Sequence, residues 1–335
     1  VLFIRFSSIG DILLTAPAVA AMRESLHGPF EIHFLTKSPN RPLLTGFSDL
    51  VDVIHTIDRS TAEVFPALRA IGFDHVIDLH NNLRSRRVKR GLDGIAFTVN
   101  KHNLAKWLLV RGWRPKPVPH IVERYVDTFR DAFGATSPTV WPEVFPGAAL
   151  PPGSPPMDRP WVALALGATH TGKQIPADTF RAVIQALLPH GLQLVLIGGP
   201  AESQLGEDLA AIAPTRIANF AGQTDFTGSA ALLRASASTI TGDTGMMHLS
   251  AAVGTPVVAV WGCTRPALGM SAWNAPKGSV DVLPVGRGGT LRPCSKLGDS
   301  CRHGDDLCIH HVDAEAIFSA ALNQTTPAAP SPPRV

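Results

Sequence analysis

Short apolar runs alternate with longer amphipathic stretches along the first half of the chain. The apolar runs have the length of strands, and the stretches between them have helical periodicity. The two clearest predicted helices are Asp11–Leu26 and Thr61–Ile71. Because strands that alternate with helices usually pair in parallel, this half predicts a parallel α/β sheet. Its predicted strands are Leu2–Phe6, Glu31–Leu35, Val53–Ile57, His75–Leu79 and Ile95–Val99.

The second half repeats this pattern. Its predicted strands are Trp161–Leu166, Gln193–Ile197, Ile217–Phe220, Thr239–Thr241 and Val257–Val260. Its predicted helices are Ala177–Leu188, Glu202–Ile212, Ser229–Arg234 and Met246–Val253. The repetition predicts two Rossmann-like domains with a ligand cleft between them.

A proline-rich segment, Phe145–Pro160, separates the two halves. Its six prolines and two glycines cannot continue a helix or a central strand, so we interpret it as the interdomain linker. We therefore predict an N-terminal domain over residues 1–150 and a C-terminal domain over residues 158–324. The tail at 325–335 is rich in proline and alanine, which predicts disorder.

Composition supports a folded two-domain protein. The chain has 335 residues, of which 45% are hydrophobic and 17% charged, and this excludes an intrinsically disordered chain. No apolar run approaches the roughly 20 residues that span a bilayer, and Val1–Phe6 fits a buried strand better than a signal peptide. We expect a cytoplasmic location, with peripheral contact at the inner face of the cytoplasmic membrane left open.

Positive charge is concentrated in one segment, although the net charge is only +3. Between Arg84 and Lys116 there are ten lysines or arginines and a single acid, Asp93. The segment is either a solvated helix surface or a binding face for phosphates or carboxylates. It has no helix-turn-helix or RNP-like signature, so we do not expect nucleic acid as a partner.

A phosphate-binding turn is predicted in Ile240–His248. A strand ends near Thr241 and a helix begins about Gly245, where unpaired N–H groups and the helix dipole favour an anion. Thr244 adds a hydroxyl, and Gly245 lets a ligand approach the backbone. The alternative is that these residues only cap the helix. His248, one turn further, is either a ligand contact or an ordinary core histidine.

Two further loops follow strands and are expected to face the cleft. In Gly167–Lys173, Lys173 could neutralise a departing diphosphate, or it is an ordinary surface lysine. The glycine spacing of this loop is not that of a Walker A motif. In Arg5–Asp11, the acid is either a helix cap or a base that accepts a proton from a sugar hydroxyl. This loop lacks G-x-G-x-x-G, which argues against a dinucleotide-binding oxidoreductase.

Together these loops resemble the motifs of a known family. Ser7–Pro17 and Gly242–Ala252, the latter followed by Gly254–Pro256, are similar to the signatures of the heptosyltransferases, glycosyltransferase family 9. The resemblance runs from residue 1 to about residue 322. It implies a GT-B fold, in which two Rossmann-like domains face an interdomain cleft. It also implies ADP-heptose as the usual donor and the 3-deoxy-octulosonate or heptose part of the lipopolysaccharide inner core as the usual acceptor.

The resemblance also implies roles for individual residues. Asp11 corresponds to the catalytic base, and Glu202 to the acid that binds the nucleotide ribose. The acceptor side is assigned to Ser8 and Gly10, together with Asn81, Asn82 and Arg84 in a loop that differs from the better-known members. The remaining donor or nucleotide contacts are assigned to Thr169, Lys173, Thr224, Asp243, Thr244, Gly245 and His248.

We therefore expect an inverting glycosyltransferase that needs neither a metal nor a cofactor. Its expected partners are a nucleotide-sugar donor and an acidic lipid A–core glycolipid. One alternative is a family member that uses another sugar or a surface polysaccharide. Others are a GT-B-like nucleotide-sugar epimerase, which would turn over its donor without an acceptor, and a non-catalytic nucleotide-binding module.

Three cysteines recur every seven residues near the end of the chain: Cys294, Cys301 and Cys308. Histidines lie close to them in the sequence, so a zinc site is conceivable, but the spacing is not C-x2-C. A disulfide is the second alternative, which a cytosolic setting disfavours. We expect reduced thiols here and no catalytic duty.

Overall fold

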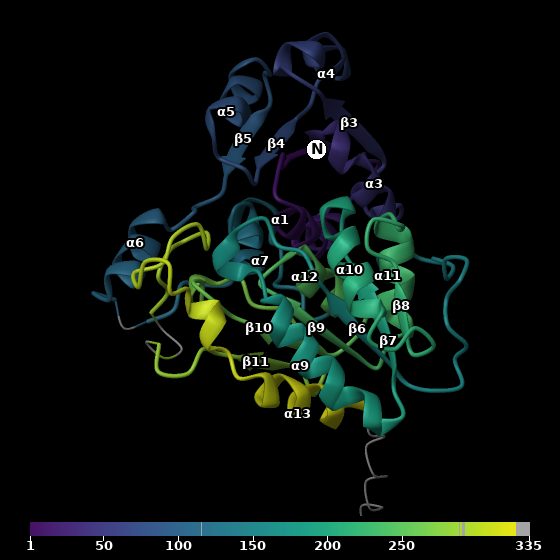
Figure 1. Ribbon diagram of the computed structural model, residues 1–335. Coiled ribbons are helices and arrows are strands. Elements are labelled where there is room, and N and C mark those ends of the chain that lie inside the picture. Colours follow the sequence, from purple (N-terminus) through teal and green to yellow (C-terminus); the bar gives the residue numbers. More distant parts are fainter. Residues whose placement is uncertain (115, 288, 290–291, 326–335) are drawn as a thin grey trace, which may run out of the picture.

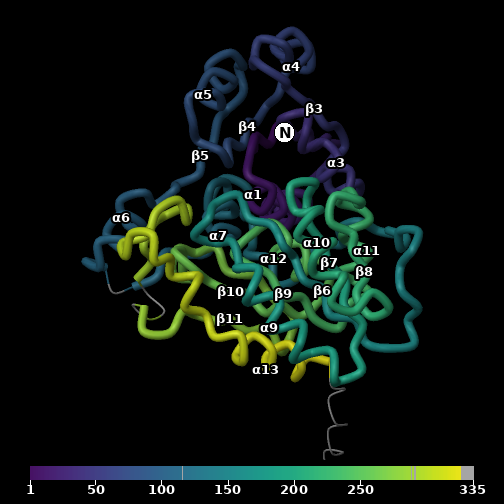
Figure 2. Tube along the Cα trace, in the orientation of Figure 1, coloured from purple at the N-terminus to yellow at the C-terminus, as the bar shows by residue number. Residues whose placement is uncertain are grey.

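The protein consists of two lobes, each built on its own parallel sheet. The computed structural model describes residues 1–114, 116–287, 289 and 292–325. The first sheet lies in the upper lobe of Figure 1, and the second lies in the broader lower lobe (Figures 1 and 2). The predicted tail from residue 326 onward lies outside the described residues. Within the described residues, no helix is both long enough and apolar enough to cross a membrane.

The first sheet has the strand order β3-β2-β1-β4-β5, and every adjacent pair is parallel. All five strands were predicted, with ends that differ by at most a few residues. The chain crosses from one side of β1 to the other between β3 and β4, so loops at the carboxyl end of β1 open onto a crevice. The strands are β1 Leu2–Ile4, β2 His33–Lys37, β3 Val53–Ile57, β4 His75–Asp78 and β5 Ile95–Thr98.

The second sheet has the order β11-β10-β9-β6-β7-β8 and is also parallel throughout. The two sheets together confirm the predicted GT-B architecture. The edge strand β11 was not predicted, because it has only three residues and two of them are exposed. The strands are β6 Trp161–Ala165, β7 Gln193–Ile197, β8 Ile217–Asn219, β9 Ser238–Gly242, β10 Val257–Val260 and β11 Val280–Val282.

The helix predicted over Asp11–Leu26 is divided in two. Helix α1 covers Ile9–Leu13 and α2 covers Ala16–Ser25. Pro17 lies in the first turn of α2, where a missing N–H is tolerated but a continuous helix would lose a hydrogen bond. Pro66 has the same effect in Thr61–Ile71, where the 3-10 helix η3 (Thr61–Glu63) precedes α4 (Phe65–Ile71).

The other helices surround the two sheets. In the first half they are α3 Arg41–Leu44, α5 Leu83–Arg90, α6 Asn103–Arg111, α7 Ile121–Val126 and α8 Arg130–Phe133. In the second half they are α9 Ala177–Leu187, α10 Ser203–Ala210, α11 Phe226–Ala235, α12 Gly245–Ala252 and α13 Ala314–Thr325. The four helices predicted in the second half are confirmed by α9 to α12. Helix α13 was not predicted, and it includes Thr325, which the sequence assigned to the tail.

The second sheet packs its two faces into different apolar clusters. Val162 and Leu164 point to the face covered by α9 and α13, which lie together at the bottom of Figure 1. The alternate positions Trp161 and Ala163 point to the opposite face and join a cluster that also contains Phe3 of the first sheet. One core therefore connects the two lobes and sets the wall of the cleft between them.

Candidate active site

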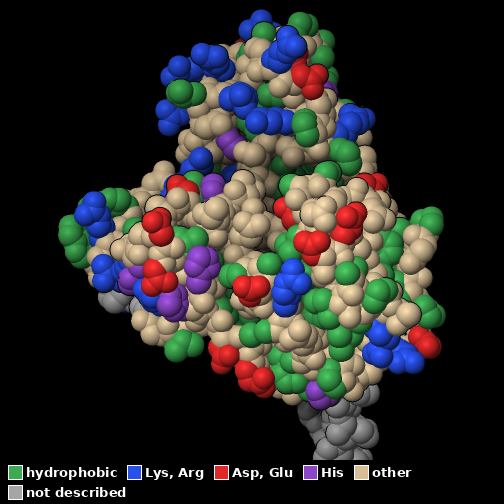
Figure 3. Space-filling view, in the orientation of Figure 1, with side chains coloured by type: hydrophobic (Ala, Val, Ile, Leu, Met, Phe, Trp, Pro, Cys, Tyr) green, Lys and Arg blue, Asp and Glu red, His purple; other side chains and the backbone are tan. Residues whose placement is uncertain are grey.

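A cavity of about 1120 Å³ lies between the two lobes and is lined by residues from both halves of the chain. In the space-filling view the molecule narrows where the lobes meet (Figure 3). The cavity brings together most residues predicted for the site: Ser8, Gly10, Asp11, Thr169, Lys173, Glu202, Thr224, Asp243, Thr244, Gly245 and His248.

The predicted acceptor residues Asn81, Asn82 and Arg84 are not among the residues that line this cavity. The Asn82 side chain accepts from the N–H of Ser85 at 2.9 Å and caps α5, and Asn81 donates to the carbonyl of Val99 at 3.0 Å. The Arg84 guanidinium lies 5.7 Å from the centre of the Phe6 ring. These contacts hold the end of the first sheet, so a role in acceptor binding stays a prediction.

Asp11 lies in α1 and is held by two neighbours. Its Oδ1 lies 2.7 Å from Arg5 Nη2, and its Oδ2 accepts from the hydroxyl and the N–H of Ser8 at 2.7 and 3.1 Å. Burial alone would raise the pKa of Asp11, but the Arg5 charge and the Ser8 hydrogen bonds lower it to about 2. With a side chain that is 19% exposed, Asp11 is an ionised carboxylate within reach of a ligand.

The helix-cap interpretation of Asp11 is also correct in part. The N–H that it accepts belongs to Ser8, the N-cap residue of α1, which is the contact that an acid in the first helical turn commonly makes. Capping uses Oδ2 and the ion pair uses Oδ1, and each carboxylate oxygen keeps a further lone pair. The same side chain can therefore cap the helix and accept a proton.

Lys173 and Asp243 form an ion pair at the wall of the cavity. Lys173 ends the 3-10 helix η4 (Thr171–Lys173), which follows β6, and Asp243 follows β9. Their Nζ and Oδ2 atoms lie 2.7 Å apart, and both side chains are largely buried. The lysine is therefore not an ordinary surface lysine, and its charge is partly balanced in the free protein.

The turn before α12 has the expected strand-turn-helix geometry. The Thr244 hydroxyl lies 3.1 Å from that of Thr241, and the N–H of Thr244 donates to the carbonyl of Gly242 at 2.8 Å. The lack of a side chain at Gly245, which lines the cavity, also serves the packing of the two lobes. A Cβ there would lie 2.7 Å from Ile9 Cγ2, so Gly245 lets α1 of the first lobe pack on α12.

His248 is neither fully a core residue nor an exposed ligand contact. It is 2% exposed, yet it lines the cavity, and its ring lies so close to Gly10 that a Cβ there would be 2.6 Å from Cδ2. Burial lowers the pKa of His248 to about 4, so the imidazole is neutral at pH 7. Its Nδ1 has no hydrogen-bond partner within the described part of the chain, which leaves one polar atom available.

The remaining predicted donor contacts follow strands of the second sheet. Glu202 ends the 3-10 helix η6 (Pro200–Glu202) after β7, and its Oε2 accepts from the N–H of Gly199 at 2.8 Å. The Thr224 hydroxyl lies 3.1 Å from that of Ser229, and Thr169 lies in the exposed loop after β6. All three thus lie beyond the carboxyl ends of parallel strands, where ligands of doubly wound sheets bind.

Several cationic residues in the cavity were not identified individually from the sequence. Lys101, Lys106 and Arg124 all line it, and Lys106 and Arg124 are only 8% and 2% exposed. Among the described residues none of the three has a carboxylate within salt-bridge distance, and Arg124 Nε has no hydrogen-bond partner. Burial and the nearby Arg124 charge lower the pKa of Lys106 to about 7.

The predicted basic segment is therefore divided by the fold. Lys101 and Lys106 belong to the cavity, whereas Arg86 and Arg87 are exposed on α5 and do not line it. The concentration of positive charge was the one sequence signal that could have indicated the cavity lysines. It could not distinguish them from the exposed arginines, because the direction of each side chain depends on where α5 and α6 pack.

Comparisons with known proteins identify the family of this chain. The sequence pattern of glycosyltransferase family 9 (heptosyltransferase) matches residues 61–281. Lipopolysaccharide heptosyltransferase 2 of Escherichia coli K12 is 27% identical over 164 residues. That match covers 44% of this chain and about half the length of the relative, 47%.

Solved structures share the fold over nearly the whole chain. A family 9 glycosyltransferase from Veillonella parvula superposes with a TM-score of 0.75 at 16% identity, over 97% of this chain and 96% of that one. The E. coli ADP-heptose lps heptosyltransferase II gives a TM-score of 0.69 at 19% identity, over 97% and 99%. Since the family pattern matches well over half of the sequence, the chain belongs to glycosyltransferase family 9.

Proposed function

We propose that the protein transfers a heptosyl group from an ADP-heptose-type donor to an acidic sugar of the lipopolysaccharide inner core. The names of the two E. coli relatives give the sugar, the nucleotide and the acceptor class. The single observation that carries the proposal is the meeting in one cavity of Asp11 from the first lobe with Lys173 and the start of α12 from the second.

The second lobe supplies the donor subsite in this proposal. Lys173 and the free N–H groups at the start of α12 contact the diphosphate, with the hydroxyl of Thr244 beside them. Glu202 accepts hydrogen bonds from the ribose hydroxyls, because a carboxylate is the usual partner of a ribose diol. His248 also lines the cavity, and we expect its imidazole, whose Nδ1 has no partner within the described chain, to contact the ligand.

Transfer is a single in-line displacement at the anomeric carbon. The acceptor hydroxyl forms the new C–O bond on one face while the bond to the diphosphate oxygen breaks on the other, so the configuration inverts. Asp11 takes the hydroxyl proton. A carboxylate with a pKa of about 2 is a weak base, so the proton moves late, after bond formation has made the hydroxyl acidic.

The leaving diphosphate is stabilised in this proposal without a divalent cation. Lys173 and the positive end of the α12 dipole supply the charge that a metal supplies in other transferases. The sequence also contains no Asp-x-Asp triplet, the usual metal-binding element of such enzymes. Because these charges are already in position, they need not move as the bond to the diphosphate breaks, which lowers the barrier to transfer.

The acceptor's acid groups bind Lys101, Lys106 and Arg124. Cations that are buried and lack a carboxylate partner gain the most from an anionic ligand. A 3-deoxy-octulosonate carboxylate or an inner-core phosphate provides such a group. These side chains lie in the same cavity as Asp11, which places the acid group of the acceptor near its reacting hydroxyl.

Contact with an anionic membrane is assigned to an exposed surface at α6, made of Leu104, Trp107, Arg111 and Trp113. The apolar side chains are exposed, the two indole rings stack edge to face at 5.3 Å, and the Arg111 guanidinium lies 5.2 Å from the Trp107 ring. Tryptophan favours the membrane interface and arginine favours anionic lipids. This surface would hold the enzyme beside an acceptor anchored by its lipid.

Mass spectrometry of the products tests the proposal. The enzyme is incubated with a panel of nucleotide sugars and defined lipid A–core acceptors, and only ADP-heptose with an inner-core acceptor should give a product heavier by one heptosyl group. The NMR coupling of the new anomeric proton should report inversion. Turnover of the donor in the absence of acceptor would support the epimerase alternative and contradict the proposal.

A further inference from the structure

All four cysteines of the chain meet at one point of the second lobe. Cys263 follows β10, Cys294 and Cys301 lie in the long loop after β11, and Cys308 begins the 3-10 helix η8 (Cys308–His311). Their four Sγ atoms lie within 4.8 Å of one another. Separate segments of the chain therefore present four possible ligand atoms to one point.

The distances between the sulfurs fit a tetrahedron around one ion. Cys294 and Cys308 have their Sγ atoms 3.4 Å apart, and Cys301 lies 3.7 Å from each of them. Four thiolates about 2.3 Å from a zinc ion are separated by about 3.8 Å. A disulfide needs sulfurs about 2.05 Å apart, and all four cysteines are free. A cluster of several ions would spread its ligands further than this.

A bound metal ionises its thiol ligands, because a coordinating thiol loses its proton outright. Four soft thiolates in tetrahedral geometry select zinc or iron over magnesium or calcium.

We propose that Cys263, Cys294, Cys301 and Cys308 bind one divalent zinc or iron ion. With all four positions filled by the protein the site is structural rather than catalytic, since a catalytic ion keeps an open position. Reduced thiols were the expectation from the sequence, and only three of the cysteines were considered together. Cys263 was missed because it is distant along the chain and has no motif of its own.

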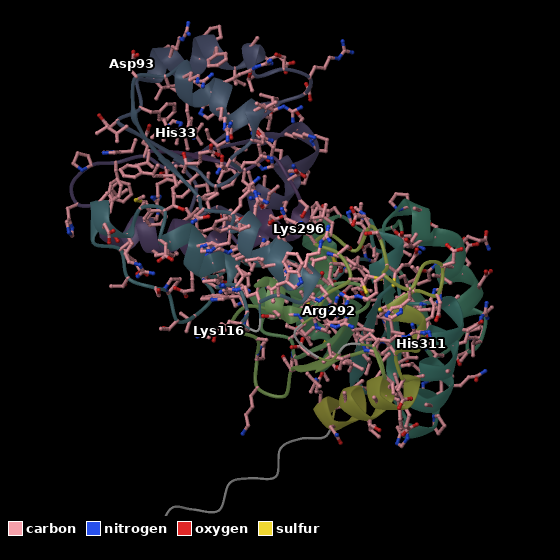
Figure 4. All side chains as sticks on the ribbon, turned by 90° about the vertical axis from the view of Figure 1, so that its left-hand side faces the viewer. His33, Asp93, Lys116, Arg292, Lys296 and His311 are labelled. Carbon is pink, nitrogen blue, oxygen red and sulfur yellow. The ribbon has the colours of Figure 1, made fainter. Side chains whose placement is uncertain are left out.

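The ion would hold a loop that supports the cleft. The N–H of Gly172 donates to the carbonyl of Gly298 at 3.1 Å, and a Cβ on Gly298 would lie 2.7 Å from Lys173 Cγ. In the same loop, Lys296 Nζ donates to Asn103 Oδ1 at the start of α6 at 2.7 Å, and Figure 4 labels Lys296 near the junction of the lobes. The site therefore fixes the backbone that carries Lys173 and links it to α6.

Metal analysis of the full chain tests this directly. Protein purified without chelators is analysed by inductively coupled plasma mass spectrometry, and about one zinc or one iron per chain is expected. The mass spectrum distinguishes zinc from iron, and bound iron also gives a visible thiolate charge-transfer absorption. Cys301→Ser should lower the metal content at least several-fold, whereas Ser300→Ala, an exposed neighbour in the same loop, should not.

A second measurement uses the wild-type protein, so it does not depend on whether the Cys301→Ser variant folds. Wild-type protein is stripped by a mercurial that titrates the thiols, reduced, and given cobalt(II), zinc or iron(II) under anaerobic conditions. Tetrahedral cobalt–thiolate bands and a higher melting temperature with one equivalent of metal support the site. Protein that contains less than about 0.1 metal per chain and binds none on reconstitution overturns it, as does a disulfide detected by the mass of the intact chain.

Discussion

Lys173 Nζ lies 2.7 Å from Asp243 Oδ2 at the wall of the interdomain cavity. The two residues follow β6 and β9, which are adjacent in the second sheet, with Ala165 opposite Thr241. Parallel pairing brings the carboxyl ends of neighbouring strands together, so the pair is a direct consequence of strand order. In the proposed function, the carboxylate holds the lysine in place for a phosphate of the donor, which then shares its charge.

Replacing Lys173 with Met should weaken donor binding. One charge-assisted hydrogen bond contributes about 1.5–3 kcal/mol, so the Kd for ADP should rise roughly 10- to 100-fold. Calorimetric titration with ADP measures this, and Lys277→Ala, an exposed lysine outside the cavity, is the matched control. The melting temperature is recorded too, because Asp243 loses its partner. Unchanged ADP affinity in a folded variant would remove Lys173 from the donor site.

A chelator should leave turnover intact if the diphosphate is stabilised by Lys173 and α12 alone. Initial rates are compared after a brief incubation with EDTA and after addition of magnesium. The zinc and iron content of the treated enzyme is measured in parallel, so that loss of a structural ion is not mistaken for loss of a catalytic one. Rates that vanish with EDTA while the zinc and iron content is unchanged, and return with magnesium, would contradict metal-independent transfer.

Asp11→Asn should lower kcat by roughly 10² to 10⁴ with little change in ADP affinity, because it removes the base and keeps the shape. It also leaves the Arg5 guanidinium without its partner, so some loss of thermal stability is expected as well. Asp131→Asn, at an exposed acid of α8 outside the cavity, is the matched control. Normal turnover by folded Asp11→Asn would exclude Asp11 as the base.

The low pKa of Asp11 gives a separate pH test. In the folded protein it is about 2, below its usual 3.8, so the ion pair contributes its full stability above about pH 4 and loses it as the pH falls toward 2. The melting temperature of the wild type should therefore drop more steeply between pH 4 and pH 2 than that of Asp11→Asn. Parallel curves for the two proteins would show that Arg5 does not stabilise the charged form.

Substitutions in the two groups of basic residues should have different effects on the KM for the acceptor. The double variant Lys101→Met with Lys106→Met removes two cations from the cavity, and its KM for the acceptor should rise about tenfold or more, with the donor KM little changed. Arg86→Gln with Arg87→Gln removes the same charge from α5 outside the cavity and should have a small effect. A larger rise of the acceptor KM in the α5 variant than in the cavity variant would favour the acceptor site that the sequence predicted near Arg84.

Lys106 should also give the acceptor kinetics a pH dependence. Its pKa of about 7 in the free protein means that it is mostly charged at pH 6 and mostly neutral at pH 8. For an acidic acceptor, kcat/KM should therefore fall across this range, and Lys106→Arg, which stays charged, should flatten the fall. An identical profile for the wild type and the arginine variant would assign the titration to another group.

The α6 surface should bind anionic vesicles. Sedimentation with vesicles that contain phosphatidylglycerol should retain the wild type and release the double variant Trp107→Ala with Trp113→Ala, and neutral vesicles should retain neither. Met157→Ala, at another exposed apolar residue, is the control. Equal retention of both variants would exclude the α6 surface as the membrane contact.

The sequence alone determined ten of the eleven described strands and three of the loops that line the cavity. Strand alternation, glycine turns and helix starts are local signals, because they depend on neighbouring residues and on the backbone preferences of glycine and proline. Asp11, Lys173 and the turn at Thr244 were found in this way, since each follows a predicted strand. The break between α1 and α2 has a local cause as well, Pro17, although its effect was not predicted.

The tertiary structure decided which distant side chains meet. Cys263 joins the other cysteines, Lys106 enters the cavity while Arg86 stays outside, and Gly245 accommodates Ile9 as well as lining the cavity. Each of these contacts joins residues from separate parts of the chain. Their geometry depends on how helices and loops pack after the sheets have formed, and no local periodicity encodes that packing.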